Sequence, residues 1–139
     1  MTGRIFLCCF AVGVIGIQWL PVCRINPPAE KAIEWDSVRT KELFDRACRD
    51  CHSNETVWPW YSKIAPISWV IAKHVDEGRG SFNISALHDE GGSNAAHAVV
   101  SGKMPLRSYL LLHPKARLND VERNALIRGL DETFTYGNN

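Results

Sequence analysis

The first 22 residues differ from the rest of the chain because they are almost entirely apolar. Residues 5–22, IFLCCFAVGVIGIQWLPV, contain no charged side chain and one glutamine, and Arg4 and Arg24 flank this run. As an α-helix, these eighteen residues extend about 27 Å, close to the hydrocarbon thickness of a bilayer. The pattern predicts an N-terminal transmembrane helix within residues 1–22.

Two other interpretations of this run remain open. A cleaved secretory signal has the same charged start and apolar centre, but no A-x-A-like cleavage site precedes Asn26. Leu20-Pro21-Val22-Cys23 loosely resembles a lipid-attachment site, although Val22 is a poor residue before such a cysteine. Under all three interpretations the remainder of the chain is exported from the cytoplasm. The uncleaved anchor is the preferred interpretation.

Residues 23–36 are expected to form a stiff connector, because Pro27 and Pro28 exclude a helix interior. Beyond it, residues 37–139 are long enough for one compact domain. Apolar residues there recur with helical spacing. The expected helices cover residues 37–51, 67–77, 91–101 and 119–131, with a loop at 102–114 that contains a turn at 109–112.

The helix ends are indicated by capping residues. Ser37 is a candidate N-cap, and Asn119 with Glu122 approximates a capping box. Gly78-Arg79-Gly80 is expected to stop the second helix. The expected buried stripes are Val38, Leu43, Phe44 and Ala47 in the first helix, and Leu118, Val121, Ala125, Leu126 and Leu130 in the last. Because no segment shows strand alternation, the predicted fold class is all-α.

The charge balance argues against nucleic acid as a partner. The net charge is +1, and Arg4 is the only charged residue among the first 23. Removing Arg4 from the 16 basic residues leaves 15, which equals the 15 acidic residues. A neutral domain has no general field that attracts polyanions.

The most specific pattern is Cys48-Arg49-Asp50-Cys51-His52, a C-x-x-C-H haem-attachment motif. Two cysteines three residues apart face the same way on a helical turn, so both thiols can reach the vinyl groups of one porphyrin. The imidazole of His52 can then bind the iron. The sequence therefore predicts one covalently attached haem c, with Phe44 near its edge.

Other uses of these thiols are less favoured. A thiol–disulfide redox site would need a thioredoxin-like context, which the flanking sequence lacks. A zinc site would need a second ligand pair at zinc-finger spacing, but His74, His88, His97 and His113 are scattered.

Met104, in Gly102-Lys103-Met104-Pro105, is the candidate for the second axial ligand. A thioether suits an iron that carries histidine on its other face. A distal histidine, with His113 the best of the four, and an open iron site are the alternatives. Trp58, Trp60, Tyr61 and Trp69 form an aromatic segment that is expected to wall the porphyrin, and Arg79 is a candidate partner of a propionate.

Four stretches together resemble the small bacterial haem-binding domain family of c-type cytochrome character. They are CRDCHSNETVWPWYSKIAPISW (48–69), DEGRGSFNIS (76–85), GKMP (102–105) and SYLLLHPKARLNDVERNAL (108–126), and QWLPVCRINPP (18–28) resembles that family's membrane-exit segment. Leu87 departs from the family, where a tryptophan is expected nearby.

The resemblance implies a cytochrome c-like helical domain with long loops around one haem. It also implies attachment through Cys48 and Cys51, His52 as proximal ligand and Met104 as distal ligand. The expected location is the bacterial inner membrane, with a single N-terminal span and the haem domain in the periplasm. The expected function is one-electron transfer with unidentified redox partner proteins. The protein is expected to be an electron carrier more than an enzyme. A haem peroxidase-like enzyme and a membrane-tethered haem redox or gas sensor are the alternatives.

Overall fold

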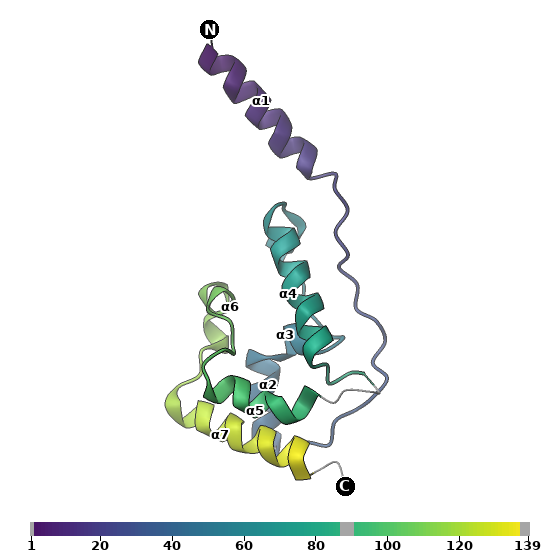
Figure 1. Cartoon of the computed structure of the whole chain (residues 1–139), viewed down its shortest axis with the longest axis vertical. Coiled ribbons are helices and arrows are strands. Elements are labelled where there is room, and N and C mark those ends of the chain that lie inside the picture. Colours follow the sequence, from purple (N-terminus) through teal and green to yellow (C-terminus); the bar gives the residue numbers. More distant parts are fainter. Residues whose placement is uncertain (1, 87–90, 137–139) are drawn as a thin grey trace. The chain divides into compact units, whose positions relative to one another are not determined.

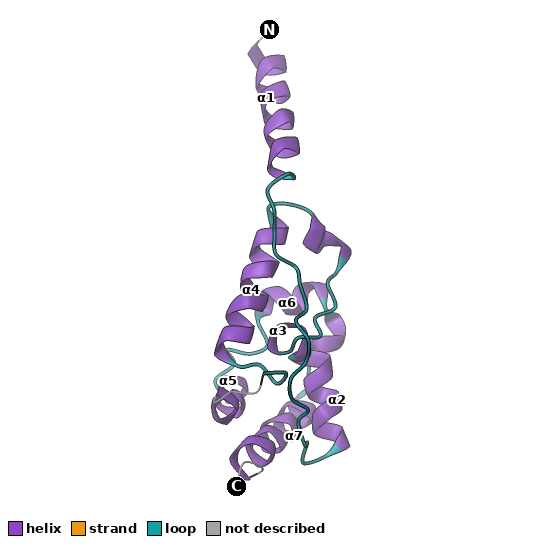
Figure 2. Cartoon of the chain, turned by 90° about the vertical axis from the view of Figure 1, so that its right-hand side faces the viewer, coloured by secondary structure: helices purple, strands orange, loops and turns teal. Residues whose placement is uncertain are grey.

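The computed structural model describes residues 2–86 and 91–136, and within these ranges it contains helices and loops but no strand (Figures 1 and 2). The all-α class predicted from the apolar spacing is therefore confirmed. The α-helices are α1 (Thr2–Ile17), α2 (Val38–Ala47), α3 (Arg49–His52), α4 (Ile67–Ser81), α5 (Ala95–Val100), α6 (Arg107–Leu112) and α7 (Asp120–Asp131). The 3-10 helices are η1 (Trp60–Lys63), η2 (Gly91–Asn94) and η3 (Pro114–Ala116), and a π-helical turn, η4 (Glu132–Tyr136), ends the described chain.

The chain divides into two compact units. The first combines Met1–Ile25 with Trp58–His74, and the second combines Asn26–Val57 with Val75–Asn139. Helix α4 begins in the first unit and ends in the second.

The predicted N-terminal transmembrane helix is wrong, and so is the location at the inner membrane by a single span that depended on it. Across residues 2–86 and 91–136, the structure has no helix with both the length and the apolar character that crossing a bilayer requires. The apolar run forms α1, whose 16 residues extend only about 24 Å. The backbone N–H groups of Gln18 and Trp19 bond three residues back, to Ile15 and Gly16, which tightens and ends the helix.

The Gln18 side chain explains why the helix stops there. Its Nε2 donates to the Val14 carbonyl at 3.0 Å and to the Ala65 carbonyl at 3.2 Å, and its Oε1 accepts from Ala65 N at 2.9 Å. Arg24 also donates to the Ser62 carbonyl at 3.0 Å. Residues 18–24 are therefore tied to the segment 62–65 instead of extending the helix.

The core of the second unit lies where α2, α5 and α7 meet. Helix α7 packs against both α2 and α5, and α5 and α7 lie side by side in both views (Figures 1 and 2). The buried core residues are Leu43, Phe44, Phe82, Ala96, Val99, Leu126, Leu130 and Phe134. Trp35, from the segment before α2, packs on Phe44 with ring centroids 4.9 Å apart.

Both predicted helix caps are confirmed. The Ser37 hydroxyl accepts a bond from Thr40 N at 3.1 Å, and Asn119 and Glu122 make both bonds of a capping box. The predicted stripes are partly wrong, because Val38 is 75% and Val121 78% exposed. Each of these valines lies in the first turn of its helix, where the chain is entering the core and one flank still faces solvent.

Two other expected boundaries change. Helix α4 continues through Gly78, Arg79 and Gly80 to Ser81, so these glycines do not stop it. The turn expected at 109–112 is part of α6. The connector contains no helix, as expected, but from Asn26 onward it belongs to the second unit, where the Pro28 carbonyl accepts from Asn54 and Glu30 N donates to the Ser85 carbonyl.

Candidate haem site

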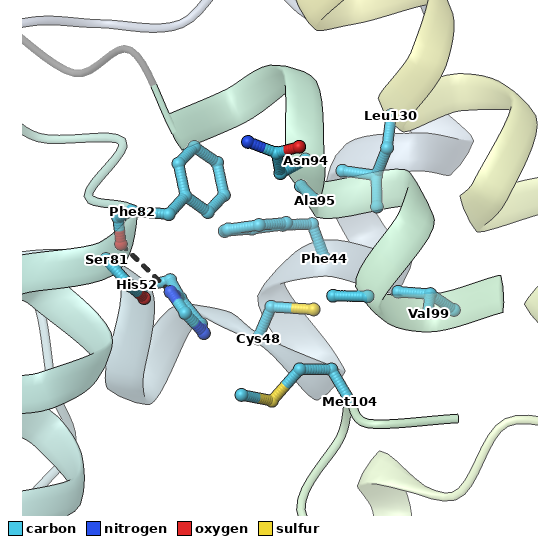
Figure 3. Close-up of a pocket in the computed structure, with 11 residues that line it drawn as sticks. Phe44, Cys48, His52, Ser81, Phe82, Asn94, Ala95, Val99, Met104 and Leu130 are labelled. Carbon is cyan, nitrogen blue, oxygen red and sulfur yellow. Dashed lines mark hydrogen bonds between the residues drawn. The ribbon is translucent and has the colours of Figure 1, made fainter. Parts of the chain in front are cut away.

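A largely apolar cavity of about 200 Å³ lies within the second unit. Cys48 and His52 reach it from one turn of the chain and Met104 from another segment, and Figure 3 shows their side chains directed toward the same space. The remaining lining residues are Phe44, Ser81, Phe82, Asn94, Ala95, Ala98, Val99 and Leu130. The structure thus brings together three of the four predicted site residues.

Cys48 lies at the junction of α2 and α3. Its φ of −128° and ψ of −35° break the helix that was expected to run unbroken to residue 51. The Cys48 carbonyl then accepts from Cys51 N at 3.1 Å and His52 N at 3.0 Å, so the motif forms one separate turn. Burial, assisted by the neighbouring Cys51, raises the pKa of the Cys48 thiol to about 12. The thiol is therefore protonated at neutral pH.

The imidazole of His52 is oriented by the chain that follows α4. Its Nδ1 lies 2.9 Å from the Phe82 carbonyl oxygen (dashed in Figure 3), and the His52 carbonyl accepts from Ile84 N at 3.0 Å. A carbonyl can only accept, so Nδ1 carries the proton in this bond. Nε2 is then the nitrogen with metal-ligand character, which is the usual arrangement of a ligating histidine.

Met104 is positioned by the turn that ends α5. Gly102 has φ of +70°, a left-handed conformation that favours glycine just beyond a helix. Met104 N then donates back to the Ala98 carbonyl at 3.1 Å. Arg123 from α7 donates to the Val99 and Val100 carbonyls at 2.6 and 3.1 Å, and so fixes the end of α5.

Cys51 is on the same turn but is not among the residues that line the cavity. It lies against α4, where a Cβ added at Gly78 would come within 2.5 Å of the Cys51 carbonyl oxygen and 3.0 Å of its Cβ. Burial raises the pKa of the Cys51 thiol to about 11. Gly78 therefore permits α4 to approach the motif closely, a role that the sequence alone did not reveal.

Sequence analysis also missed Tyr109 and Phe82. The Tyr109 hydroxyl donates to Asp50 Oδ2 at 2.8 Å, which joins α6 to the centre of the C-x-x-C-H motif. The Phe82 ring contacts the rings of His52, at a centroid distance of 5.6 Å, and Phe44, at 6.1 Å. The only local signal was that both residues lie in stretches that resemble the family.

The alternative distal histidines are placed differently from Met104. His97 is exposed, and His113 stacks on Tyr109 at a centroid distance of 4.0 Å; neither lines the cavity. His74 belongs to the first unit. His88 lies outside the described residues, as does Leu87, the site of the departure from the family.

The aromatic segment belongs to the first unit, where Trp60 is 72% exposed and Ser62 is buried, with its hydroxyl donating to the Pro59 carbonyl. Its expected role as a porphyrin wall stays a prediction. Arg79 is engaged within the protein: it donates to the Ser53 carbonyl, Asn26 Oδ1 and Thr56 Oγ1, each at 2.9 Å.

The residues around the cavity suit a haem. Porphyrin is a flat apolar ring with a central iron, and the cavity offers apolar and aromatic walls. It also offers an imidazole nitrogen and a thioether sulfur, which are established axial ligands of haem iron, and a thiol at its edge.

Comparison with known proteins agrees with this fit. No curated protein and no solved structure matches the chain significantly. A family model described as a haem-binding domain matches residues 12–132, which is most of the sequence and covers parts of both units. The cofactor expected from the C-x-x-C-H motif is thereby confirmed as haem. The chain belongs to the haem-binding domain family.

Proposed function

We propose that this protein is a c-type cytochrome that carries single electrons. In this proposal Cys48 and Cys51 form thioether bonds to one haem, and His52 and Met104 are its axial ligands. The observation that carries the proposal is that Cys48, His52 and Met104 line one apolar cavity, while the Phe82 carbonyl faces Nδ1 of His52.

The Phe82 carbonyl has a defined task in this proposal. By accepting the Nδ1 proton of His52 at 2.9 Å, it keeps Nε2 as the ligating nitrogen and prevents the ring from turning. The bond also raises the basicity of the imidazole. A backbone carbonyl is a constant partner, because no side-chain titration can remove it.

The walls of the cavity keep water away from the site. Phe44 and Leu130 are each only 1% exposed, and Phe82 is 7% exposed. Haem iron supplies a reversible one-electron couple, and the burial and hydrogen bonding of its surroundings set the potential. A rigid apolar wall suits a carrier, since little around the site rearranges when the charge changes.

Met104 distinguishes the carrier from the alternatives. The Gly102 turn and the bond from Met104 N to the Ala98 carbonyl hold a thioether that would supply the second ligand of the iron. A peroxidase-like enzyme or a gas sensor requires an open distal position instead. No observation in the described residues favours that open position.

The test is the optical spectrum of the ferric, haem-loaded protein and of the variant M104A, with K103A as the matched control. Lys103 is exposed and precedes Met104 in the same turn. We expect a low-spin spectrum with a weak far-red band from sulfur–iron ligation in the wild type and K103A, and a high-spin spectrum in M104A. A high-spin wild type whose spectrum M104A leaves unchanged would show that the carrier assignment is wrong.

A further inference from the structure

A second cavity, of about 290 Å³, adjoins the first at Val99 and Met104, which line both. Three of its lining residues are arginines, Arg107, Arg117 and Arg123, and none is acidic. The remaining lining residues are Gly102, Pro105, Leu110, Ala116 and Leu118. The cavity contains neither attachment cysteine nor His52, and its lining arginines create a positive field suited to an anion.

Haem combines an apolar ring with two carboxylates, and the first cavity suits only the ring. The polar residues on its wall, Ser81, Asn94 and His52, include no lysine or arginine. A carboxylate left in such surroundings without a cation or several donors would be strongly destabilised. The carboxylates must therefore leave the first cavity toward solvent or toward a cation.

The three arginines differ in how far the protein already engages them. Arg123 uses one terminal nitrogen on the last carbonyls of α5, and Arg117 donates from Nε to the Leu110 carbonyl at 3.2 Å. Arg107 makes no hydrogen bond or ion pair with the residues that the structure describes. Arg117 anchored through Nε keeps the terminal nitrogens of its guanidinium for a carboxylate, the geometry that favours paired N–H···O bonds.

We propose that Arg107 and Arg117 bind the propionate carboxylates of the haem in the cavity that adjoins the haem pocket at Met104. This inference rests on the proposed function, because it requires the porphyrin to lie between His52 and Met104. It assigns the propionates to this pair and not to Arg79, whose guanidinium holds Ser53, Asn26 and Thr56 together.

The experiment compares haem-loaded wild type, the double variant R107Q/R117Q and the control R128Q. Arg128 is an exposed arginine of α7 that lines neither cavity. Two readouts are needed: the propionate bending band in the resonance Raman spectrum, and the midpoint potential. We expect the band to move in the double variant only. We also expect the midpoint potential of the double variant to fall. At the midpoint potential of the wild type, the Fe(III):Fe(II) ratio of the double variant should be about three- to tenfold higher than that of the wild type, because loss of nearby positive charge favours the ferric state.

Other outcomes would overturn the inference in recognisable ways. A potential that shifts while the propionate band stays fixed would mean that the arginines act on the iron through space. If added inorganic phosphate changes the wild-type potential but not that of R107Q/R117Q, the cavity binds a free anion. A double variant indistinguishable from the wild type removes the propionate assignment alone, whereas a wild type without haem removes the proposed function as well.

Discussion

Asp50, between the two cysteines of the motif, joins three parts of the second unit. Its Oδ2 accepts from the Tyr109 hydroxyl at 2.8 Å, its Oδ1 accepts from Val57 N at 3.0 Å, and its carbonyl accepts from Thr56 Oγ1 at 2.6 Å. Burial, together with the bond to Asp50, raises the pKa of Tyr109. The phenol therefore remains a donor throughout the neutral range.

The bond between Tyr109 and Asp50 should contribute measurably to stability. Replacing Tyr109 by phenylalanine keeps the ring but leaves a carboxylate oxygen without its donor, which costs about 1–3 kcal/mol of unfolding free energy. Urea unfolding of wild type and Y109F measures this loss.

The matched control for Y109F is S108A, which also removes a hydroxyl from α6, but from an exposed side chain. We expect S108A to change the unfolding free energy by less than about 0.5 kcal/mol. If Y109F lowered the unfolding free energy no more than S108A, the hydrogen bond between α6 and the motif would make no measurable contribution to stability.

At the scale of elements, the approach of α4 to the motif depends on one glycine. A Cβ at Gly78 would meet three atoms of Cys51 at 2.5–3.2 Å, and two of them belong to the backbone, which cannot move aside cheaply. Gly80, two residues later in the same helix, has no atom within 4 Å of such a Cβ.

Replacing each of these two glycines by alanine should therefore have opposite effects on stability. G78A should destabilise the second unit by about 1–3 kcal/mol, because the helix must shift away from Cys51. G80A should be neutral or stabilise by up to about 1 kcal/mol, because alanine favours a helix. Thermal or urea unfolding of both variants checks this, and equal effects would contradict the packing of α4 on the motif.

The ion pair between α2 and α7 predicts that the stability of the protein depends on pH. The Arg46 guanidinium forms an ion pair with the Glu122 carboxylate at 2.7 Å and holds the pKa of Glu122 below its ordinary value of 4.5. A depressed folded-state pKa stabilises the protein at pH values above 4.5, and the contribution is lost as pH falls through the folded-state value.

We therefore expect the difference in unfolding free energy between wild type and E122Q to be constant near neutrality and to shrink below about pH 4.5. When E122Q is instead compared with its parent in an R46Q background, this acid-dependent difference should be smaller. The reason is that R46Q removes the main cause of the lowered pKa of Glu122. Chemical unfolding as a function of pH measures both. A difference between wild type and E122Q that grows on acidification would have the wrong sign.

Local signals located the elements, and non-local packing decided their limits. Ser37 and the Asn119–Glu122 pair act within one helical turn, so their caps could be predicted. The end of α4 could not, because Gly78 is tolerated in the helix through its contact with Cys51, 27 positions earlier. The apolar run at the N-terminus has enough apolar residues for a transmembrane helix. The bonds between Gln18 and Ala65, which accompany the early end of the helix, cannot be read from the sequence.

At the scale of the whole molecule, the candidate site was predictable where its chemistry lies in short motifs. The cysteine spacing and the Met-Pro pair located Cys48, Cys51, His52 and Met104, and three of these line one cavity. The partners that orient them, Phe82 and Tyr109, come from segments 30 and 59 positions away from His52 and Asp50. Only the folded chain reveals such partners.

Covalent attachment of haem at Cys48 and Cys51 is the central claim, and intact mass under denaturing conditions tests it most directly. The protein is produced with haem-maturation enzymes as wild type, as C48A/C51A and as C23A, whose cysteine is exposed. We predict that wild type and C23A retain the added mass of one haem after denaturation and that C48A/C51A has none. A wild-type chain with the mass of the polypeptide alone would contradict the account.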